Sequence, residues 1–450
     1  MRRSEFLDRH DRRLESPFLD AIRRSFREVD RTQWLPGEQI RKLQIAKAKR
    51  LIAFAKKRVP MYRELYSSDA VIDSIDDFRS LPQTSRKDFA DCDIKYRTAE
   101  KLPIGQQVLF SETTSGTTGD VVMIDRTNVL EAWRHACIIR ECDWWNIDPN
   151  GTCAVIRMPS NKHESGWNEE INGTIVNHWN RDGFELLFGS GTGYHMDASA
   201  KPEQIAKSII KLQPDYIQAT GTLLLSIAEY MSDYRPKALL TIGENLYAPM
   251  KASLLEYFRA PVYDIYAAVE TNRTAATCPY SDRYHVHDEN AIVEILHDDG
   301  TPCEPGEIGN VVVTSLHNYS TPVIRYDIGD LAEVPTSPCP CGRGLTTIEC
   351  FQGREIARLR LEGGRKRIAL GFVMTMNDIP GVKKFRLTQR GLDDFELRIT
   401  GRKTLCDEEF ARIRQSIEQT VERRIALRIT PVDDIPLGPR GKLTKIEFVD

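Results

Sequence analysis

The sequence lacks any long apolar run, and this absence excludes several classes of protein. No segment approaches the roughly 18 consecutive apolar residues that a membrane-spanning helix needs. The first five residues are mostly charged and no apolar core follows them, so we expect no signal peptide. The formal net charge is only −3, and no basic stripe of the kind that binds nucleic acid is present. We therefore expect a cytoplasmic protein with neither a membrane nor a nucleic acid as partner.

The chain also lacks internal repeats and low-complexity segments, and its cysteines show no sign of a disulfide framework. Because we expect no export signal, the ten cysteines are expected to be thiols or metal ligands. Most of them show no ligand spacing and are expected to be small core or surface thiols: Cys92, Cys137, Cys142, Cys153, Cys303, Cys350 and Cys406. A length of 450 residues exceeds one compact core, so we expect two or three domains.

What is present is an alternation of helical and strand-like patterns. The first hundred residues are helical in pattern, as in 40–58. Helices are then predicted at 203–212, 223–230 and 249–258, and strands at 215–219, 238–242 and 262–266. Short strands with turns follow at 291–335, and a small α+β unit follows residue 353 with strands at 384–387, 395–400 and 427–432 and a helix at 407–423. This order predicts an α/β fold with several sheets and ligands beyond the strand ends.

Residues 111–119, Ser-Glu-Thr-Thr-Ser-Gly-Thr-Thr-Gly, are the most informative segment. They lie between two strand-like runs at 107–110 and 121–124. Such a loop can turn tightly and direct backbone N–H groups and hydroxyls to one point, as a phosphate requires. It is not a Walker loop, because Asp120 stands where that motif has lysine. The alternative is a flexible hairpin turn.

Four further segments follow in order. They are Tyr-Ala-Ala-Val-Glu at 266–270, Arg-Tyr-Asp-Ile-Gly-Asp at 325–330, Gly-Arg at 353–354 and Pro-Leu-Gly-Pro-Arg-Gly-Lys at 436–442. From about residue 45 to the C terminus the chain resembles the adenylate-forming superfamily of acyl- and aryl-CoA ligases, particularly the phenylacetate-CoA ligase and capsule-synthesis branch. The resemblance implies a large multi-sheet N-terminal adenylation domain (1–353) and a small mobile α+β C-terminal lid (354–450).

The resemblance also implies an activity. The expected enzyme is an ATP-dependent, AMP-forming ligase that makes an acyl-adenylate and passes it to a thiol, with CoA as the expected acceptor. Transfer to an amine or a carrier protein, or adenylation of a group other than a carboxylate, is the main alternative. A non-catalytic relative that only binds nucleotide is another, and a homodimer is one possible assembly.

Roles for individual residues follow from this resemblance. Glu270 would coordinate Mg²⁺, and Asp330 would accept hydrogen bonds from both ribose hydroxyls. Lys442 would bring positive charge to the developing acyl-phosphate. Taken singly, each is also an ordinary solvated or turn residue. The remaining nucleotide candidates are Thr114, Ser115, Gly116, Thr117, Thr118 and Gly119 for the phosphates, with Thr117 also catalytic, Gly243, Glu244 and Tyr266 beside adenine, and Arg354 for phosphate or ribose oxygens.

A second group of residues points to a metal. Cys339 and Cys341 form a C-x-C pair in a loop rich in proline and glycine, and Cys278 and His285 lie upstream. Thiolates and an imidazole in tetrahedral number favour Zn²⁺, and members of the resembled branch look metal-bound at this arrangement. The four residues are therefore predicted to hold a structural zinc ion. His287 is a competing imidazole, and four unligated side chains are the other alternative.

The chain departs from the family pattern at three positions and in one stretch. Asp120 replaces a lysine often found after the second glycine, Val269 replaces a Ser or Thr, and Ile356 lies where relatives have paired aspartates that include the lid's hinge. The adenylation step is therefore better supported than the thioester step. The stretch 161–170, expected to line the acid pocket, is polar and includes Lys162, His163 and Trp167. It predicts a polar or charged, aromatic acid, unless it is a solvated loop.

Overall fold

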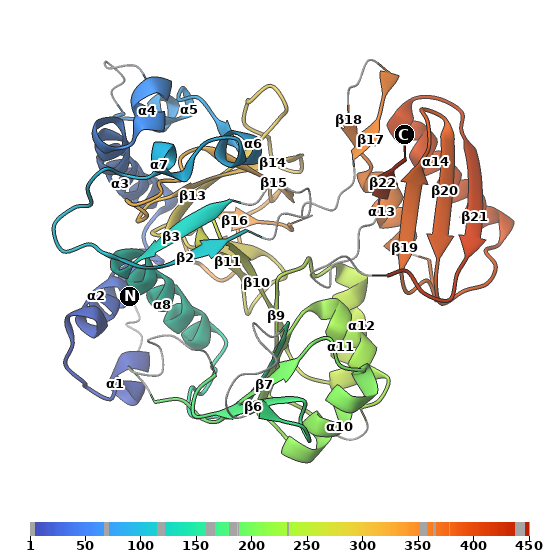
Figure 1. Cartoon of the computed structure of the whole chain (residues 1–450), viewed down its shortest axis with the longest axis horizontal. Coiled ribbons are helices and arrows are strands. Elements are labelled where there is room, and N and C mark those ends of the chain that lie inside the picture. The colour runs from blue at the N-terminus through green and yellow to red at the C-terminus, as the bar shows by residue number, and fades with distance from the viewer. Residues whose placement is uncertain are drawn as a thin grey trace. The chain divides into compact units, whose positions relative to one another are not determined.

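The computed structural model describes residues 5–66, 72–114, 122–158, 167–179, 187, 189–231, 234–351, 358–362, 366–377, 379–436 and 446–449. The chain divides into a larger unit of residues 1–246 and 250–351 and a smaller unit of residues 247–249 and 352–450 (Figure 1). Among the described residues, no helix combines the length and hydropathy that crossing a bilayer requires. The predicted α/β fold class with several sheets is confirmed.

The larger unit contains most of the helices and strands. Its helices are α1 (Phe6–His10), α2 (Pro17–Thr32), α3 (Gly37–Arg58), α4 (Pro60–Leu65), α5 (Ile75–Arg79), α6 (Arg86–Ala90), α7 (Ile94–Arg97), α8 (Asn128–Trp144), α10 (Pro202–Leu212), α11 (Gly221–Ala228) and α12 (Ala248–Phe258). Its strands are β1 (Thr84–Ser85), β2 (Val108–Thr113), β3 (Met123–Thr127), β4 (Cys153–Arg157), β5 (Trp167–Asn168), β6 (Gly173–Val176), β7 (Gly193–Asp197), β8 (Tyr216–Ala219), β9 (Ala238–Ile242), β10 (Val262–Ala268), β11 (Asn272–Thr277), β12 (Tyr284–Val286), β13 (Ala291–Leu296), β14 (Ile308–Ser315), β15 (Tyr326–Glu333) and β16 (Thr347–Ile348).

A ten-stranded mixed sheet, in the order β16-β12-β11-β10-β9-β8-β4-β7-β6-β5, is the framework of this unit. Its central strands β10, β9, β8, β4 and β7 are parallel. Side chains alternate between the two faces, as strand geometry requires. On β4, Cys153 and Val155 belong to the core shared with α2 and α8, whereas Ala154 and Ile156 belong to the core shared with α10, α11 and α12. Apolar residues on both faces explain why helices cover both.

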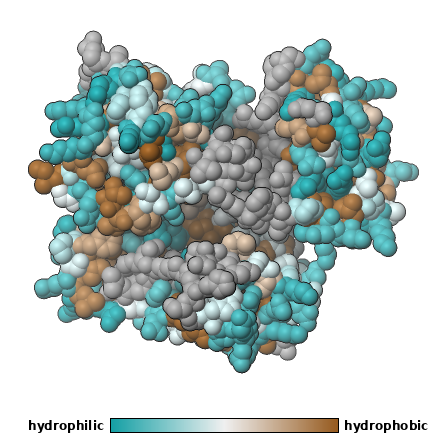
Figure 2. All heavy atoms as spheres, in the orientation of Figure 1, coloured by the Kyte–Doolittle hydropathy of each residue, from teal (hydrophilic) through white to brown (hydrophobic). Residues whose placement is uncertain are grey.

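Two smaller sheets complete the larger unit. Strands β1, β15, β14 and β13 form a four-stranded sheet, and β2 and β3 form an antiparallel ribbon. The four-stranded sheet shares a core with α3 and α4. The alternative reading of Asp330 as an ordinary turn residue is wrong, because the residue lies within β15. The visible face of the unit carries both hydrophilic and hydrophobic side chains (Figure 2).

The smaller unit is an α+β structure with its own core. It contains β17 (Arg358–Arg360), β18 (Lys366–Ile368), α13 (Leu370–Asn377), β19 (Phe385–Gln389), β20 (Asp394–Ile399), α14 (Asp407–Val421), β21 (Ala426–Pro431) and β22 (Ile446–Phe448). Strands β21-β20-β19-β22 form a sheet, and β17 pairs with β18. On α14 the buried positions Ile413, Ile417 and Val421 recur at helical spacing and join the sheet's core.

The core of the larger unit contains a carboxyl group that should make its stability depend on pH. Asp264 on β10 is buried and accepts hydrogen bonds from the Thr241 and Tyr284 hydroxyls. Burial raises the pKa of Asp264 to about 6, above the roughly 3.9 of an unfolded chain. The native state thus binds more protons between those values, so the free energy of unfolding falls as pH rises through that window.

Replacing Asp264 with asparagine should remove this pH dependence. A pKa difference of about 2 corresponds to at most about 3 kcal/mol. Between pH 4 and pH 7, the free energy of unfolding of the variant should therefore rise by up to that amount relative to that of the unmodified chain. Denaturant unfolding at four pH values measures the difference. Asp282→Asn, at a position where the side chain is 88% exposed, is the control. If the free energies of unfolding of Asp264→Asn and of the unmodified chain changed with pH in parallel, Asp264 would not be the source of the pH dependence.

Candidate active site

Glu270 lies in the turn that joins β10 to β11, and its carboxylate is almost fully buried. The side chain is 1% exposed. Its Oε1 accepts a hydrogen bond of 2.8 Å from Arg86 Nη2 and one of 3.2 Å from the Tyr326 hydroxyl. A buried carboxylate is costly unless it is paired and hydrogen-bonded, and both conditions are met here. The predicted magnesium ligand is therefore held in one orientation by groups from two other elements.

The same arginine reaches the end of β2, where the predicted phosphate loop begins. Arg86 Nη1 donates to Thr114 Oγ1 at 3.1 Å. That oxygen also accepts from the backbone N of Val122 at 2.9 Å, and Thr114 N donates to the Val122 carbonyl at 2.8 Å. Thr114 and Val122, which flank the segment 115–121, are thus bonded to each other, and the Arg86 guanidinium connects Thr114 to Glu270.

Asp330 and Tyr266, two further predicted residues, are in contact. The Tyr266 hydroxyl donates to Asp330 Oδ2. One face of the Tyr266 ring is stacked on Phe351, with centroids 3.6 Å apart and planes at 6°. On β15, Tyr326 and Asp330 are four residues apart, and the pairing of β15 with β14 is irregular between Asp327 and Leu331. Tyr326 contacts Glu270, and Asp330 contacts Tyr266. β15 therefore lies beside the hairpin of β10 and β11, which carries both Tyr266 and Glu270.

The predicted turn at 243–244 follows the neighbouring strand. β9 is parallel to β10, with Ile242 opposite Ile265, so Gly243 comes at the level of Tyr266. Gly243 has φ +90°, a conformation that favours glycine, and a Cβ there would meet no atom within 4 Å. Glu244 Oε1 accepts a hydrogen bond from the backbone N of Thr222. The carboxyl ends of adjacent parallel strands are where open α/β sheets bind ligands.

The other predicted site residues lie in an edge strand or outside the described residues. Trp167 is half-buried in β5, an edge strand paired with β6. The predicted residues that lie outside the described ones are Ser115, Gly116, Thr117, Thr118, Gly119, Lys162, His163, Arg354 and Lys442.

The sequence-based prediction missed Arg86 and Tyr326. Both residues bond to Glu270 because β1, a strand of only two residues, pairs with β15. In this parallel pair, Thr84 lies opposite Tyr326. The Ser85–Asp88 capping box then starts α6 at Arg86 and fixes its backbone. The capping pattern is visible in the sequence, but the pairing of β1 with a strand some 240 residues away is not.

The four predicted metal ligands form one cluster. One ligand atom from each of Cys278, His285, Cys339 and Cys341 lies within 4.8 Å of all the others. Cys339 Sγ is 3.6 Å from Cys278 Sγ, and His285 Nε2 is 3.1 Å from Cys341 Sγ. Tetrahedral zinc with Zn–S bonds near 2.3 Å places two sulfur ligands about 3.8 Å apart. The donor set and its spacing therefore fit zinc.

Hydrogen bonds to the sulfurs favour the thiolate form that a metal needs. The backbone N–H groups of Tyr280 and Arg343 point at Cys278 Sγ and Cys341 Sγ, at 3.4 and 3.5 Å. The hydrogen bond between Cys278 and Cys341 holds the pKa of the Cys341 thiol well below its usual range and raises that of the Cys278 thiol, so Cys341 is the sulfur that becomes a thiolate first. All ten cysteines lie in the described part of the chain and none of them is in a disulfide, as expected for thiols or metal ligands.

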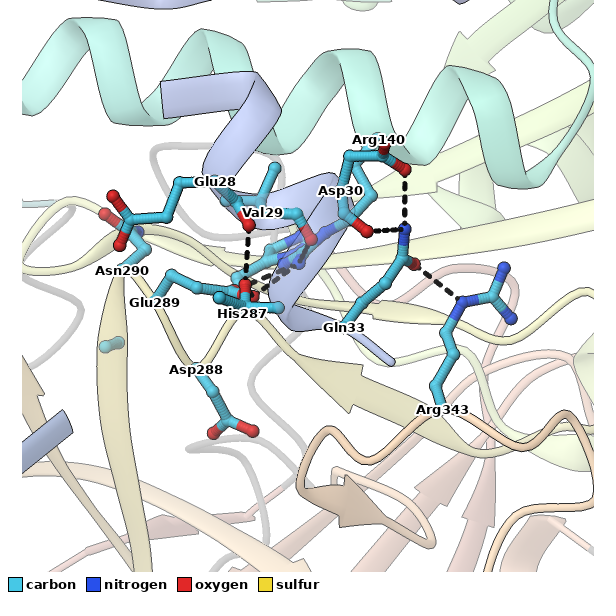
Figure 3. Close-up of polar contacts among 12 residues, drawn as sticks. Glu28, Val29, Asp30, Gln33, Arg140, His287, Asp288, Glu289, Asn290 and Arg343 are labelled. Atoms are coloured by element: carbon cyan, nitrogen blue, oxygen red, sulfur yellow. Dashed lines mark hydrogen bonds and ion pairs between the residues drawn. The ribbon is translucent and has the colours of Figure 1, made fainter. Parts of the chain in front are cut away.

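His287, the competing imidazole, has other partners. Its Nδ1 is 2.6 Å from Arg140 Nη2 and its Nε2 is 2.8 Å from Glu141 Oε1. Burial, followed by the Arg140 charge, lowers the pKa of His287. Arg140 also donates to Glu289 Oε1 at 3.0 Å and to the Val29 carbonyl at 3.2 Å (Figure 3). His287 thus belongs to a buried network that ties α2 and α8 to the chain after β12.

The loop that carries Cys341 is attached to the same helices. Arg343 Nε donates to Gln33 Oε1 at 2.9 Å (Figure 3). The Arg343 guanidinium lies over the Trp34 ring at 5.0 Å and over the Trp144 ring at 4.6 Å. Trp144 Nε1 donates to Gln33 Oε1 as well, at 2.8 Å. The metal-ligand cluster therefore lies at a junction between the ten-stranded sheet and α2 and α8.

A second group of donors, His297, Cys303 and Glu307, also lies together among the described residues. His297 Nε2 is 3.0 Å from Glu307 Oε2, and its Nδ1 is 3.6 Å from Cys303 Sγ. Each ring nitrogen faces a different partner, so the imidazole does not present one nitrogen to a position shared by both. Burial, with Glu307 next, raises the pKa of the Cys303 thiol. We regard these three residues as a partly exposed hydrogen-bonded group.

Comparison with known proteins supports the resemblance drawn from the sequence. No family model matches the chain. A phenylacetate-coenzyme A ligase of Thermus thermophilus is 22% identical over 92% of this chain and 97% of its own length, and one of Escherichia coli K12 is 25% identical over 68% and 70%. A 2-hydroxyisobutyryl-CoA ligase bound to 2-HIB-AMP superposes with a TM-score of 0.72 at 16% identity, over 93% of this chain and 91% of that one. An anthranilate CoA ligase bound to anthranoyl-AMP gives 0.51 at 14% identity, over 74% and 65%. The fold is that of the adenylate-forming CoA ligases, with a large N-terminal and a small C-terminal domain.

Proposed function

We propose that the chain is an ATP-dependent, AMP-forming ligase that activates a carboxylic acid as an acyl-adenylate and transfers it to a thiol, with CoA as the acceptor. One observation carries the proposal. In a fold of adenylate-forming CoA ligases, the loop entry at Thr114, the carboxylate of Glu270 and the Tyr266–Asp330 pair come from distant segments and are linked through β15 and Arg86. The relatives that align with most of the chain are phenylacetate-coenzyme A ligases.

The chemistry assigned to these residues is positioning and charge stabilisation. A carboxylate oxygen of the acid attacks the α-phosphorus of ATP and pyrophosphate leaves; the thiol then attacks the acyl carbon and AMP leaves. The hydroxyls and backbone N–H groups of the loop after Thr114 would bind the leaving phosphates. Asp330, an acceptor-only carboxylate beside Tyr266, would bind the ribose hydroxyls. Lys442 would stabilise charge on the reacting phosphate in the first step only, because the C-terminal unit turns between the two steps.

Two metal ions are part of the proposal. Glu270 is a hard oxygen ligand of the kind that, with substrate phosphates, holds Mg²⁺, which would offset phosphate charge. Cys278, His285, Cys339 and Cys341 would hold a structural Zn²⁺. The proposed zinc has no part in the reaction and stabilises the folded junction.

Pyrophosphate exchange into ATP, measured with a panel of carboxylic acids, tests the proposal. Exchange should require Mg²⁺ and an acid, and thioester should form when CoA is added. The altered hinge region at 353–357 keeps one rival open, in which an amine or a carrier-protein thiol accepts the acyl group. Pyrophosphate release that proceeds with such an acceptor and is not stimulated by CoA would favour the rival. Absence of exchange with every acid, together with no binding of nucleotide, would refute the proposal.

The same panel should show a preference for polar acids. The stretch 161–170 is rich in charged and amide residues, and a site that hydrogen-bonds its substrate discriminates against analogues that lack the partner group. We expect hydroxylated or amino-substituted aromatic acids to exceed plain phenylacetate in kcat/KM by about tenfold or more. The Trp167→Ala variant should weaken binding of aromatic acids in particular. A preference for plain phenylacetate would contradict the polar pocket.

A further inference from the structure

The proposed phosphate site has a cation that comes from outside its loop. Asp120 stands where a lysine often follows the second glycine, so the loop does not supply that charge itself. Arg86, on α6, instead contacts both the first residue of the loop region, Thr114, and the proposed magnesium ligand, Glu270. Of the proposed site residues that the structure describes, Arg86 is the one that brings a positive charge.

We propose that Arg86 exchanges partners during nucleotide binding. Before ATP arrives, its guanidinium is the counter-ion of Glu270. With Mg²⁺ and ATP bound, Glu270 would serve as a ligand of the metal, and the Arg86 guanidinium would turn to the phosphate oxygens and supply the charge that the missing loop lysine does not. This inference rests on the proposed function and names a residue that the family pattern did not supply.

The first half of the exchange follows from burial. Glu270 is 1% exposed and Arg86 13% exposed, so water screens the attraction between their charges only weakly. Removing one partner of such a pair is strongly destabilising, because the other charge is left buried and unpaired. A dication at the carboxylate would satisfy Glu270 in place of Arg86, and a triphosphate would satisfy Arg86 in place of Glu270. Magnesium-bound ATP would therefore supply a new partner for Glu270 and a new partner for Arg86 at the same time.

The second half follows from the geometry of the guanidinium. Its two terminal nitrogens already diverge, one to Glu270 Oε1 and the other to Thr114 Oγ1. The planar fork of arginine suits phosphate oxygens. The β1–β15 pairing and the capping box fix the backbone of Arg86, so only its side chain has to turn. The contact with Thr114 keeps the guanidinium at the base of the loop throughout.

A double-mutant cycle on ATP binding without metal tests the exchange. In EDTA, Glu270→Gln should release the guanidinium for the phosphates and tighten ATP binding about tenfold. In a background of Arg86→Ala, the same change should give little gain. A tenfold gain that persists without Arg86 would mean that loss of the negative charge alone was responsible, and it would overturn the inference. Unchanged or weaker binding by Glu270→Gln would overturn it as well.

Turnover with Mg²⁺ gives a second readout. Arg86→Ala should lower kcat/KM for ATP in pyrophosphate exchange about 100-fold, and Arg86→Lys should restore part of the loss because one charge remains. Lys87→Ala removes a charge from the next, exposed position of α6 and should behave like the unmodified chain. Melting curves identify variants that do not fold, and Arg86→Lys keeps the test decisive if Arg86→Ala is one of them.

The two levels of proposal fail differently. If the unmodified chain binds no nucleotide and exchanges no pyrophosphate, the proposed function is wrong. If it does both and Arg86→Lys and Arg86→Ala retain full kcat/KM for ATP, only the exchange of partners is wrong.

Discussion

Replacement of Cys341 by serine should abolish tight metal binding and lower the melting temperature of the larger unit by roughly 5–10 °C. The thiol is one of four donors that lie within 4.8 Å of one another, and a structural metal contributes its binding free energy to folding because the unfolded chain has no preformed site. The loss should extend beyond the cluster, since Arg343, two residues on, is bonded to Gln33 and lies over Trp144. Pyrophosphate exchange should therefore fall as well, through the loosened sheet that carries β10 and β11.

Metal content and thermal unfolding measure this effect. The purified chain should contain about one zinc per chain, and the variant close to none. Cys406→Ser, at an exposed cysteine of the smaller unit, is the matched control and should leave both quantities unchanged. A chain that purifies without metal, takes up none from added Zn²⁺, and melts at the same temperature with and without Cys341 would show that the four side chains are unligated.

Replacement of Lys442 by alanine should separate the two half-reactions. Adenylate formation should fall by roughly 10²–10³-fold, the usual cost of losing one group that stabilises transition-state charge. Thioester formation from supplied acyl-adenylate and CoA should stay nearly intact, because the ammonium group would act only while the acid attacks the phosphorus. Pyrophosphate exchange measures the first step, and single-turnover thioester formation measures the second.

The control for this experiment lies three residues away. Lys445→Ala removes the same charge from the same segment and should leave both steps close to normal. An equal loss in both steps for Lys442→Ala would contradict the assignment, since it would place the lysine in binding or folding rather than in the first chemical step.

Much of the secondary structure could be predicted from the sequence, because local patterns decide it. The strand predicted at 238–242 is β9, and the helix predicted at 249–258 is α12 with one residue added. Helix and strand periodicities are properties of neighbouring residues, so they are readable without knowledge of the fold. The order of the five motif segments gave the family resemblance, which the comparisons support.

The contacts within the site could be predicted only in part. The sequence proposed Glu270, Asp330 and Tyr266 as neighbours of one ligand, but it gave no partner for any of them. It also left His285 and His287 open as metal ligands, and the structure brings His285 to the three cysteines while His287 faces Arg140 and Glu141. Both histidines are fully buried, so the choice depends on what each side chain meets.

By itself, the sequence determined the α/β fold class, the order of the motif segments and the identity of the four metal-ligand candidates, because spacing and residue type carry that information. Only the tertiary structure decided that Arg86 pairs with Glu270 and that Tyr266 donates to Asp330. These pairs join residues that are 184 and 64 positions apart. Their contact depends on which strands lie side by side, as β1 does with β15, and strand order is set by the packing of the whole unit.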